Sequence, residues 1–502
     1  KNTYADAIAT LNKSFNDWSV NVNLGVSLSD SRYEMIGYEG GLKLINFFAV
    51  HNIDFNKAWK AKQSGWHDQT RAIFANAEIG WKSMIYLTAT GRNDWDSRLA
   101  FSDYKSFFYP SIGLSAILTS MFNAPDWLTY LKVRGSYTEV GNSYGRFMTT
   151  VTYPYDEQTQ SWTSTSSYPN TKLKPERTKS WEVGLDARIL NDISLNLTYY
   201  RSNTYNQTFY ADLSLSSGYS NIPIQSGNIM NEGLEMSLGY NKQWKDFSFN
   251  TNYTLTWNKN RVKRLADGVY NYATGQPIQM PELSPLTYGH TDARLILRVG
   301  GSMGDVYGQR LLKRDLNGYI LNEEGVGLAM ENKETYLGSI LPKMNMGWSL
   351  GFGYKGVNLG MTFTGRFGGI VISETQSVLD AAGVSKVSAD VRDAGGVQIN
   401  QGKVSAQTYY QAIQGTAAYY TYSATNVRLG ELSLSYTLPK KWFDNKVGMT
   451  VGLVGKNLWM IYCKAPFDPE LTTSAASNFY QGFDAYMLPS TSNFGFNIKF
   501  QF

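Results

Sequence analysis

Apolar and polar residues alternate along most of this chain. The segment VNVNLGVSL (20–28) has Val or Leu at every second position, with Asn, Gly and Ser between them. The same two-residue period recurs in WEVGLDARI (181–189), FSFNTNYTLTW (247–257) and MNMGWSLGFGY (344–354). Because successive side chains of a β-strand point to opposite faces, this period predicts strands, and no long helical pattern competes with it.

The pattern predicts fifteen strands. Many of them run for ten to fourteen residues, longer than the about 5–6 residues typical of globular sheets. A strand needs about 9–11 residues to cross a bilayer at a tilt, so these lengths favour a membrane-spanning sheet. The expected strands occupy residues 3–13, 19–32, 69–81, 83–94, 107–119, 128–140, 177–189, 192–205, 227–241, 246–258, 343–354, 356–370, 425–438, 446–459 and 489–502.

The connections between these strands alternate in length. After the first strand, short turns such as NDW, LND and KG are followed by much longer links. Short periplasmic turns and long external loops are typical of outer-membrane barrels, whereas a soluble sandwich or propeller has no reason to segregate loop lengths by side. We therefore predict an all-β fold, a transmembrane antiparallel β-barrel. The long links are 33–68, 95–106, 141–176, 206–226, 259–342, 371–424 and 460–488.

The strand count predicts that the barrel extends beyond this chain. A bacterial barrel normally has an even number of strands and both ends in the periplasm. With fifteen strands and the last one ending in the periplasm, the first strand would start outside the cell. An odd number of strands is then expected upstream. We expect residues 1–502 to be the carboxyl-terminal part of a single barrel domain.

Composition agrees with a membrane barrel and excludes other classes. Aromatic residues make up 14% of the chain, with 35 Tyr, and such rings suit a membrane–water boundary. The mean hydropathy is −0.33, and no apolar stretch approaches the ~18 residues of a spanning helix. The single cysteine, Cys463, excludes an internal disulfide framework. A net charge of +5, spread along the chain, gives no argument for a nucleic-acid partner.

Several ordered motifs resemble the carboxyl-terminal part of SusC/RagA-type TonB-dependent transporters of Bacteroidota outer membranes. The resemblance implies a barrel of 22 strands, of which about 15 lie in this chain; the seven others form an odd number, as the strand count requires. The motifs are NTKLKPERTKSWEVGLD, SGYSNIPIQSGNIMNEGLEMSL, YLGSILPKMNMGWSLGFGYKG, LGELSLSYTLPK, VGKNL, KAPFDPE and YQGFDAYMLPSTSNFGFNIKFQF.

The same resemblance implies a function and partners. Members of the family carry an amino-terminal plug and a TonB-contacting segment, neither of which is recognisable here, and no cofactor is implied. They usually pair with a SusD-like surface lipoprotein and import oligosaccharides or peptides across the outer membrane. The alternatives from the residues alone are a structural or adhesive outer-membrane barrel and, less favoured, an outer-membrane hydrolase.

The carboxyl terminus is an alternating strand that ends on an aromatic residue. Its apolar face would meet lipid, and the resemblance implies that such a strand is the signal read by the outer-membrane assembly machinery. The alternative is a lipid-facing strand with no further role. The residues of this candidate signal are Phe494, Phe496, Ile498, Phe500 and Phe502.

Catalytic and metal chemistry finds little support in the sequence. The three histidines, His51, His67 and His290, lack the partners that a nucleophilic device needs, so no enzymatic activity is predicted. The segment RDLNGYI offers Asp315 and Asn317 as oxygen ligands for calcium, but Tyr319 stands where a third donor belongs. A glycine-assisted turn is the preferred interpretation there.

Tyrosines in or beside the long loops are the candidates for substrate contact. Their rings can stack on sugars, although the same residues commonly pack loops together or form an interfacial girdle. We also expect the loops 259–342, 371–424 and 460–488 to contact the lid lipoprotein, because loops this long are uncommon unless functional. The alternative is a rim of loops folded over one another. The candidate tyrosines are Tyr153, Tyr155, Tyr409, Tyr410, Tyr419, Tyr420 and Tyr422.

Overall fold

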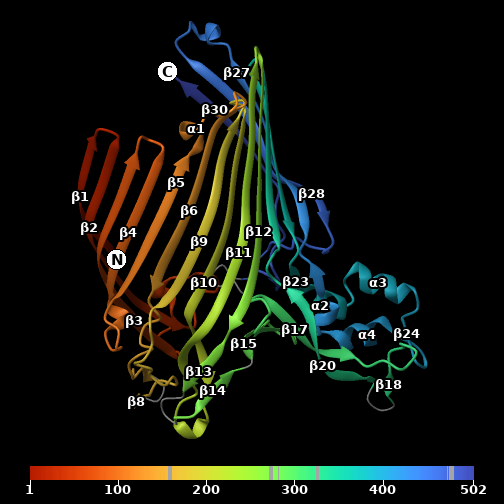
Figure 1. Cartoon of the computed structure of the whole chain (residues 1–502). Helices are drawn as coiled ribbons and strands as arrows, with labels where there is room; N and C mark the ends of the chain where they lie inside the picture. Colours follow the sequence, from red (N-terminus) through yellow and green to blue (C-terminus); the bar gives the residue numbers. More distant parts are fainter. Residues whose placement is uncertain (157–160, 271–274, 281, 324–326, 472, 474–479) are drawn as a thin grey trace.

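One curved antiparallel sheet of fifteen strands makes up most of the chain (Figure 1). The computed structural model describes residues 1–156, 161–270, 275–280, 282–323, 327–471, 473 and 480–502. Each strand of the sheet pairs with the next one along the chain, from red β1 to blue β30. The strands are β1 (Asn2–Phe15), β2 (Trp18–Gly40), β3 (Trp59–Trp81), β4 (Ile85–Asp96), β5 (Phe107–Ile117), β6 (Leu128–Asn142), β9 (Glu176–Ile189), β10 (Ile193–Asp212), β11 (Asn221–Trp244), β12 (Phe247–Arg264), β21 (Met344–Tyr354), β22 (Val357–Phe367), β27 (Asn426–Leu438), β28 (Gly448–Cys463) and β30 (Asn493–Gln501).

Each of the fifteen predicted strands corresponds to one strand of this sheet, in the predicted order. The largest errors lie at the ends next to long loops: β2 continues to Gly40, and β3 already begins at Trp59. The ladder of backbone hydrogen bonds continues there, from Arg32↔His67 to Gly40↔Trp59. Apolar alternation stops earlier because it requires lipid on one face, which backbone pairing does not.

The sheet has one apolar face that is open to its surroundings. Apolar side chains of neighbouring strands are opposite one another on this face, as in Val26↔Ile73 and Leu453↔Phe496. An exposed apolar surface this wide is not stable in water and fits the lipid-facing band of a barrel. More than half of the surface is exposed for Leu24, Val26, Ile73, Ile112, Leu114, Val183, Leu453, Phe494 and Phe496.

Aromatic rings border this band at the short turns. Trp18 and Trp81 face each other across β2 and β3 with ring centroids 6.5 Å apart, and Trp244 stacks on Phe247 at 5.6 Å. Amphipathic rings at this level form the interfacial girdle of a membrane barrel. Further exposed members of the girdle are Phe15, Trp127, Tyr354 and Trp442.

Short turns and long loops lie at opposite ends of the sheet, as predicted. The short links are tight, with left-handed backbone at Asn16, Lys245 and Lys355, and the short helix α1 (Leu118–Met121) fills one of them. The long links gather at the lower end in Figure 1. In the orientation that the resemblance implies, the lower end of the picture would be the cell exterior.

The long loops contain ordered structure that the period-two pattern does not predict. A small sheet is formed by β15 (Glu282–Thr287), β16 (Arg294–Arg298), β17 (Asp305–Leu312) and β20 (Met330–Ser339). Three helices follow in the next loop: α2 (Glu374–Ala381), α3 (Lys386–Asp393) and α4 (Ala406–Ile413). Two-stranded ribbons are β7–β8 (Tyr155–Asp156, Ser161–Trp162), β13–β14 (Ala266–Tyr270, Pro277–Met280), β18–β19 (Asn322–Glu323, Gly327–Leu328) and β24–β25 (Val397–Ile399, Gly402–Val404).

The helices begin at serine caps. The hydroxyls of Ser373, Ser385 and Ser405 each accept a hydrogen bond from the backbone N–H three residues further on. Such caps satisfy donors that the first turn leaves free. Within the described part of the chain, no helix has the length and apolar content needed to cross a membrane.

Three of the long external loops share one hydrophobic core. Tyr288, Ile372 and Phe483 come from three different loops and lie buried in the same cluster. Backbone pairing joins them too: β23 (Ile370–Ser373) pairs with β26 (Thr421–Ser423) and, in parallel, with β29 (Phe483–Asp484). The loops therefore form a single folded external platform.

Candidate functional site

The external mouth of the sheet contains an open polar pocket of about 570 Å³. Its walls are the extended ends of β2 and β3 and the ribbon β7–β8. By the alternation along β3, Lys60, Lys62 and Ser64 lie on the same face as the polar wall of the barrel interior. The residues around the pocket are Met35, Lys60, Lys62, Gln63, Ser64, Pro154, Tyr155, Asp156 and Thr163.

An aromatic pair stands beside this pocket. Tyr155 and Trp162 meet edge to face with ring centroids 5.2 Å apart, across the two strands of the ribbon. They are 50% and 70% exposed, which leaves much of both rings free to contact a ligand. Flat, exposed rings next to lysines suit a substrate with apolar faces and polar or acidic groups.

A second aromatic group lies close to it on β2 and β3. Trp66 stacks on Tyr33 at 5.8 Å, and the Arg146 guanidinium lies 3.7 Å from the centre of the Trp66 ring. Arg146 also forms an ion pair of 2.7 Å with Asp68. The cation–π contact and the ion pair fasten the loop between β6 and β9 against β3, so that the loop holds Tyr155 at the mouth.

The inner wall below the mouth is charged and hydrogen-bonded. Arg134 Nη1 lies 2.6 Å from Asp186 Oδ2, and its Nη2 donates to Thr198 Oγ1 at 2.6 Å. A Cβ at Gly184 would meet the Arg134 guanidinium at 2.7 Å, so the glycine makes room for this arginine. A hollow of about 480 Å³ lies alongside, lined in part by Glu78, Lys132 and Glu182.

A buried ion pair anchors the loop that follows β28. Both Nη atoms of Arg428 contact the Asp468 carboxylate, at 3.0 and 2.8 Å, and the two side chains are only 11% and 9% exposed. Burial alone would raise the pKa of Asp468, but the hydrogen bonds from Arg428 outweigh it and hold that pKa below its usual value. Asn426 and Glu470 extend the network, in which both carboxylates, Asp468 and Glu470, belong to the KAPFDPE motif.

A second buried carboxylate ties the external platform together. Asp292 Oδ2 accepts from the backbone N–H of Arg310 at 2.8 Å, and its Oδ1 accepts from the N–H of Ala417 at 2.7 Å. These donors belong to two different loops. Asp292 thus serves as a structural link, and the backbone N–H of the neighbouring His290 donates to Glu374 Oε2 at 3.3 Å.

Two of the candidate tyrosines are not available for substrate contact. Tyr410 and Tyr420 are 5% and 2% exposed and lie in one cluster with residues such as Leu312 and Ile413. Burial also raises the pKa of Tyr420, so its phenol stays protonated. These two tyrosines pack the loops, which was the alternative interpretation, because the platform has a core of its own.

The remaining tyrosines differ in their surroundings. Tyr409 and Tyr419 pack against the same cluster while partly exposed, and Tyr422 packs on Phe467 with ring centroids 5.7 Å apart. Tyr153 is 62% exposed in the loop that leads to the ribbon. Of the seven candidates, Tyr153 and Tyr155 are the two whose rings are most open to a ligand, and their contact with substrate stays a prediction.

The segment considered for calcium forms a turn. Asp315 Oδ1 accepts from the backbone N–H of Asn317 at 2.8 Å and of Tyr319 at 2.9 Å, while Gly318 adopts φ +84°. Arg314 donates to the Gly318 carbonyl at 2.6 Å. Asp315 Oδ1 and the Gly318 carbonyl thus accept hydrogen bonds within the turn. Among the described residues, no group of three or more His, Cys, Asp or Glu could hold a metal.

Several residues of the mouth were not among the predicted sites. Lys60, Lys62 and Trp162 belong to no recognised motif, and their position beside Tyr155 gives them a role. The sequence also predicted the loop between β2 and β3 as a long link but assigned no functional residues to it, although it contains the apolar segment LINFFAV. This loop exposes a set of apolar side chains: Leu44, Ile45, Phe47, Phe48, Val50 and Phe55.

The apolar face of the carboxyl-terminal strand points to the lipid side of the sheet, as expected from its pattern. Phe494 and Phe496 are 81% and 78% exposed, and Phe496 is opposite Leu453 of β28. Ile498, Phe500 and Phe502 continue the same exposed face. That the assembly machinery reads these residues stays a prediction.

Comparisons with known proteins identify the family of this barrel. The model of the TonB dependent receptor-like β-barrel matches residues 2–458. The TonB-dependent receptor P3 of Formosa agariphila is 24% identical, over 99% of this chain and 52% of its own length. SusC of Bacteroides thetaiotaomicron is 25% identical over 47% of this chain and 22% of its own length.

Solved structures agree on the fold. The RagAB peptide importer in the closed-closed state superposes on this chain with a TM-score of 0.75 at 18% sequence identity. The superposition covers 99% of this chain and 55% of the RagAB chain. The open-open state gives a TM-score of 0.73 at 19% identity, with 99% and 54% covered. This chain spans about half the length of the curated relatives that it matches over most of its own length.

These findings confirm the predicted family, the barrel fold and the location in the outer membrane. They also agree with the prediction that the protein is not an enzyme, because TonB-dependent receptors are transporters. The match of the family model covers most of the chain, from the first strand of the sheet into β28. The chain belongs to the TonB-dependent receptors of the bacterial outer membrane, in their β-barrel domain.

Proposed function

We propose that the intact protein imports a bulky nutrient, an oligosaccharide or a peptide, through this barrel with energy from TonB. The observation that carries the proposal is the mouth pocket, which is lined by Tyr155 and two lysines, with Trp162 packed against Tyr155. A structured external platform next to a charged inner wall suits capture followed by passage. Relatives named SusC and RagAB support the same function.

The barrel itself is proposed to extend beyond this chain. Strands β1 and β30 are the outer strands of the sheet, each paired on one side only in the described residues. Unpaired edges are not stable within a hydrocarbon layer, because their backbone donors and acceptors need partners. Further strands of the same barrel, a plug and a TonB-contacting segment would complete the importer.

Substrate capture at the mouth is testable by removing the aromatic pair. The double substitution Tyr155→Ala and Trp162→Ala removes two exposed rings that pack on each other across the ribbon. We expect ligand binding by the intact receptor to weaken about tenfold, since aromatic contacts of this kind contribute roughly 0.5–1.5 kcal/mol each. The measurement is equilibrium binding of a panel of oligosaccharides and peptides by calorimetry.

A matched control is Tyr319→Ala. Tyr319 is an exposed tyrosine, 48% accessible, in an external turn away from the mouth pocket. It should leave binding unchanged. Equal binding by the double variant and the unaltered receptor would show that the mouth aromatics do not contact the ligand.

The partner is proposed to be a SusD-like surface lipoprotein that covers the external platform. Helix α3 and the turn before it present Val384 and Val387, which are 69% and 54% exposed, on the loop already expected to contact a lid. The double substitution Val384→Glu and Val387→Glu should abolish co-purification of the lipoprotein in mild detergent, since buried unpaired charges disfavour an interface. Ile45→Glu is the control, because Ile45 is 88% exposed in the loop between β2 and β3, which is not among the loops expected to contact the lid.

This test separates the lid from a self-contained rim. Retention of the lipoprotein by the α3 variant would remove that helix from the interface. If the unaltered receptor also purified without a lipoprotein, the partner proposal itself would be wrong, and the loops would serve as a rim folded over one another.

A further inference from the structure

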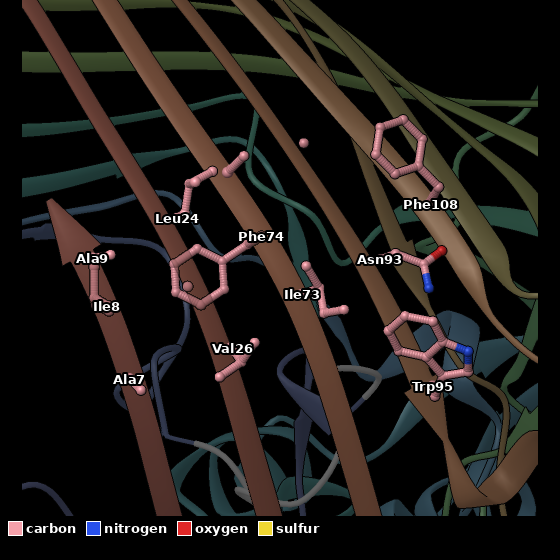
Figure 2. Close-up of a pocket in the computed structure, with 13 residues that line it drawn as sticks. Ala7, Ile8, Ala9, Leu24, Val26, Ile73, Phe74, Asn93, Trp95 and Phe108 are labelled. Atoms are coloured by element: carbon pink, nitrogen blue, oxygen red, sulfur yellow. The ribbon is translucent and has the colours of Figure 1, made fainter. Parts of the chain in front are cut away.

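A groove runs along the lipid-facing side of β1 to β5, in the half of the membrane nearest the cell exterior. Its floor consists of small residues, Ala7 and Ala9 on β1, Ala75 on β3 and Gly91 on β4, and its volume is about 840 Å³. Larger side chains border it, and Figure 2 shows Leu24 and Val26 on one side and Trp95 and Phe108 on the other.

The backbone register fixes the height of this groove in the membrane. Trp81 belongs to the aromatic girdle at the short turns, and Ile73 lies eight residues before it in the same strand, toward the cell exterior. At roughly 3.3 Å per residue and a tilt of about 40°, Ile73 stands about 20 Å above that girdle. The apolar band of such barrels is about 25 Å tall, so the groove lies in the outer leaflet.

A cationic side chain, Arg71, lies at the end of the groove nearest the cell exterior. Arg71 pairs with Leu28 and Trp95 in the register and donates from Nε to Gln69 Oε1 at 3.0 Å. None of the ion pairs between described residues includes Arg71. It also borders the adjoining hollow beside Ala5 and Ala7. An arginine with no carboxylate partner at the membrane surface suits a phosphate group.

An amide lies inside the groove, below this cation. Asn93 is opposite both Ile73 and Phe108, and in Figure 2 its side chain lies between the rings of Phe108 and Trp95. No hydrogen bond to its side chain occurs among the described residues. A polar group that faces hydrocarbon is costly unless it is satisfied, so a polar atom of a bound lipid would stabilise the Asn93 amide.

The order of these features along the groove matches a lipid whose phosphate lies outside the carbonyl of its acyl chain, and the position in the outer leaflet favours a glycolipid. Two residues of a strand span about 6.6 Å, so the Asn93 level is one short step below the Arg71 level. We propose that the groove binds a phosphorylated, acylated glycolipid of the outer leaflet. The phosphate pairs with Arg71, the carbonyl that links the acyl chain accepts from the Asn93 amide, and the chain lies over the alanines.

This proposal rests on the outer-membrane location and not on the imported substrate. The occupant is held against the outside of the barrel, away from the mouth pocket. A bound glycolipid would stabilise the strands that pair with β1, because a ligand that binds only the folded state adds to its stability.

The test uses the intact receptor, extracted in mild detergent and examined by native mass spectrometry with added phosphorylated glycolipid. We expect the unaltered receptor to retain the glycolipid in preference to phosphatidylethanolamine. Arg71→Gln should reduce retention about fivefold, since one cation near an anionic surface contributes about that much. Ala75→Leu, which fills the floor, should reduce it about tenfold through lost acyl-chain contact.

Two control variants keep the test specific. Lys13→Gln removes a cation from the same face of β1 at the opposite end of the band, where Lys13 is opposite Val20, and Ala116→Leu enlarges a lipid-facing residue near the girdle. Both should retain the glycolipid fully. Retention by Arg71→Gln and Ala75→Leu equal to the controls, preference for phosphatidylethanolamine, or a lipoprotein acyl chain in place of the glycolipid would overturn the proposal.

Discussion

Replacing Arg428 with methionine is expected to release the loop that begins at residue 464. The substitution leaves the Asp468 carboxylate, only 9% exposed, without its bidentate partner. Removing one member of a buried pair typically costs about 3–5 kcal/mol. At the lower bound, backbone amides of residues 464–471 should exchange with solvent roughly 100-fold faster, as measured by hydrogen–deuterium exchange of the receptor in detergent.

The control and the pH dependence make this prediction specific. Arg392→Met removes an exposed pair with Asp393, 64% and 76% accessible, and should change exchange very little. Since the pKa of Asp468 is lowered in the folded state, its contribution is complete above the usual aspartate pKa of about 3.9 and is lost as the pH falls through the lower, folded-state value. Similar exchange for Arg428→Met and Arg392→Met at neutral pH would contradict the anchoring role.

Arginine at Ile112 is the second substitution with a large expected effect. Ile112 is 52% exposed on the apolar face of β5, about midway between the girdle and the external end of the band. A lipid-facing Arg near the midplane costs about 2–4 kcal/mol in a barrel. Ile112→Arg should therefore lower the free energy of unfolding of the receptor, measured in lipid bilayers by denaturant titration.

The adjacent residue supplies the control. A Cβ at Gly113 would meet its nearest atom at 3.8 Å, so a side chain fits there, and the position faces the polar hollow that contains Glu78 and Glu182. Gly113→Arg should cost much less than Ile112→Arg. Equal losses for the two neighbours would contradict the assignment of the faces of β5.

The sheet could be predicted from the sequence because the membrane imposes a local rule. Every residue of a spanning strand faces either lipid or the interior. The residue type reflects the face, as with the apolar Ile112 toward lipid and Gly113 toward the polar interior. The fifteen strands therefore required no knowledge of contacts. Only their external ends, such as Gly40 of β2, were missed, because there the rule no longer applies while pairing continues.

The external platform could not be predicted in the same way, since its contacts join distant residues. Ser373 donates to Asp484 Oδ2 at 2.6 Å, across 111 positions of the chain. The helices do have a local signal in the sequence: Ser373 followed by Gln376 is typical of a capped helix start, which a two-residue period does not reveal. The pattern of short strands such as β23 is too brief to be read alone.

The candidate substrate site was predicted in part. Tyr155 lies at the mouth pocket, whereas Tyr420, in a similar aromatic loop segment, is buried in the core of the platform. Loop tyrosines are equivalent in the sequence, and only tertiary packing separates an exposed ring from a buried one. The same tertiary packing places the lysines and Trp162 beside Tyr155 at the mouth, which the sequence alone does not reveal.

The most direct test of the barrel wall is the accessibility of spin labels along β9. Single cysteines would be introduced at residues 181–187 of the intact receptor on a Cys463→Ser background, and collision with oxygen dissolved in the bilayer would be measured by electron paramagnetic resonance. Our account predicts maxima at Trp181, Val183, Leu185 and Ala187, with minima at the residues between them, Glu182, Gly184 and Asp186. Oxygen accessibility without this two-residue period would contradict a strand with one face in lipid.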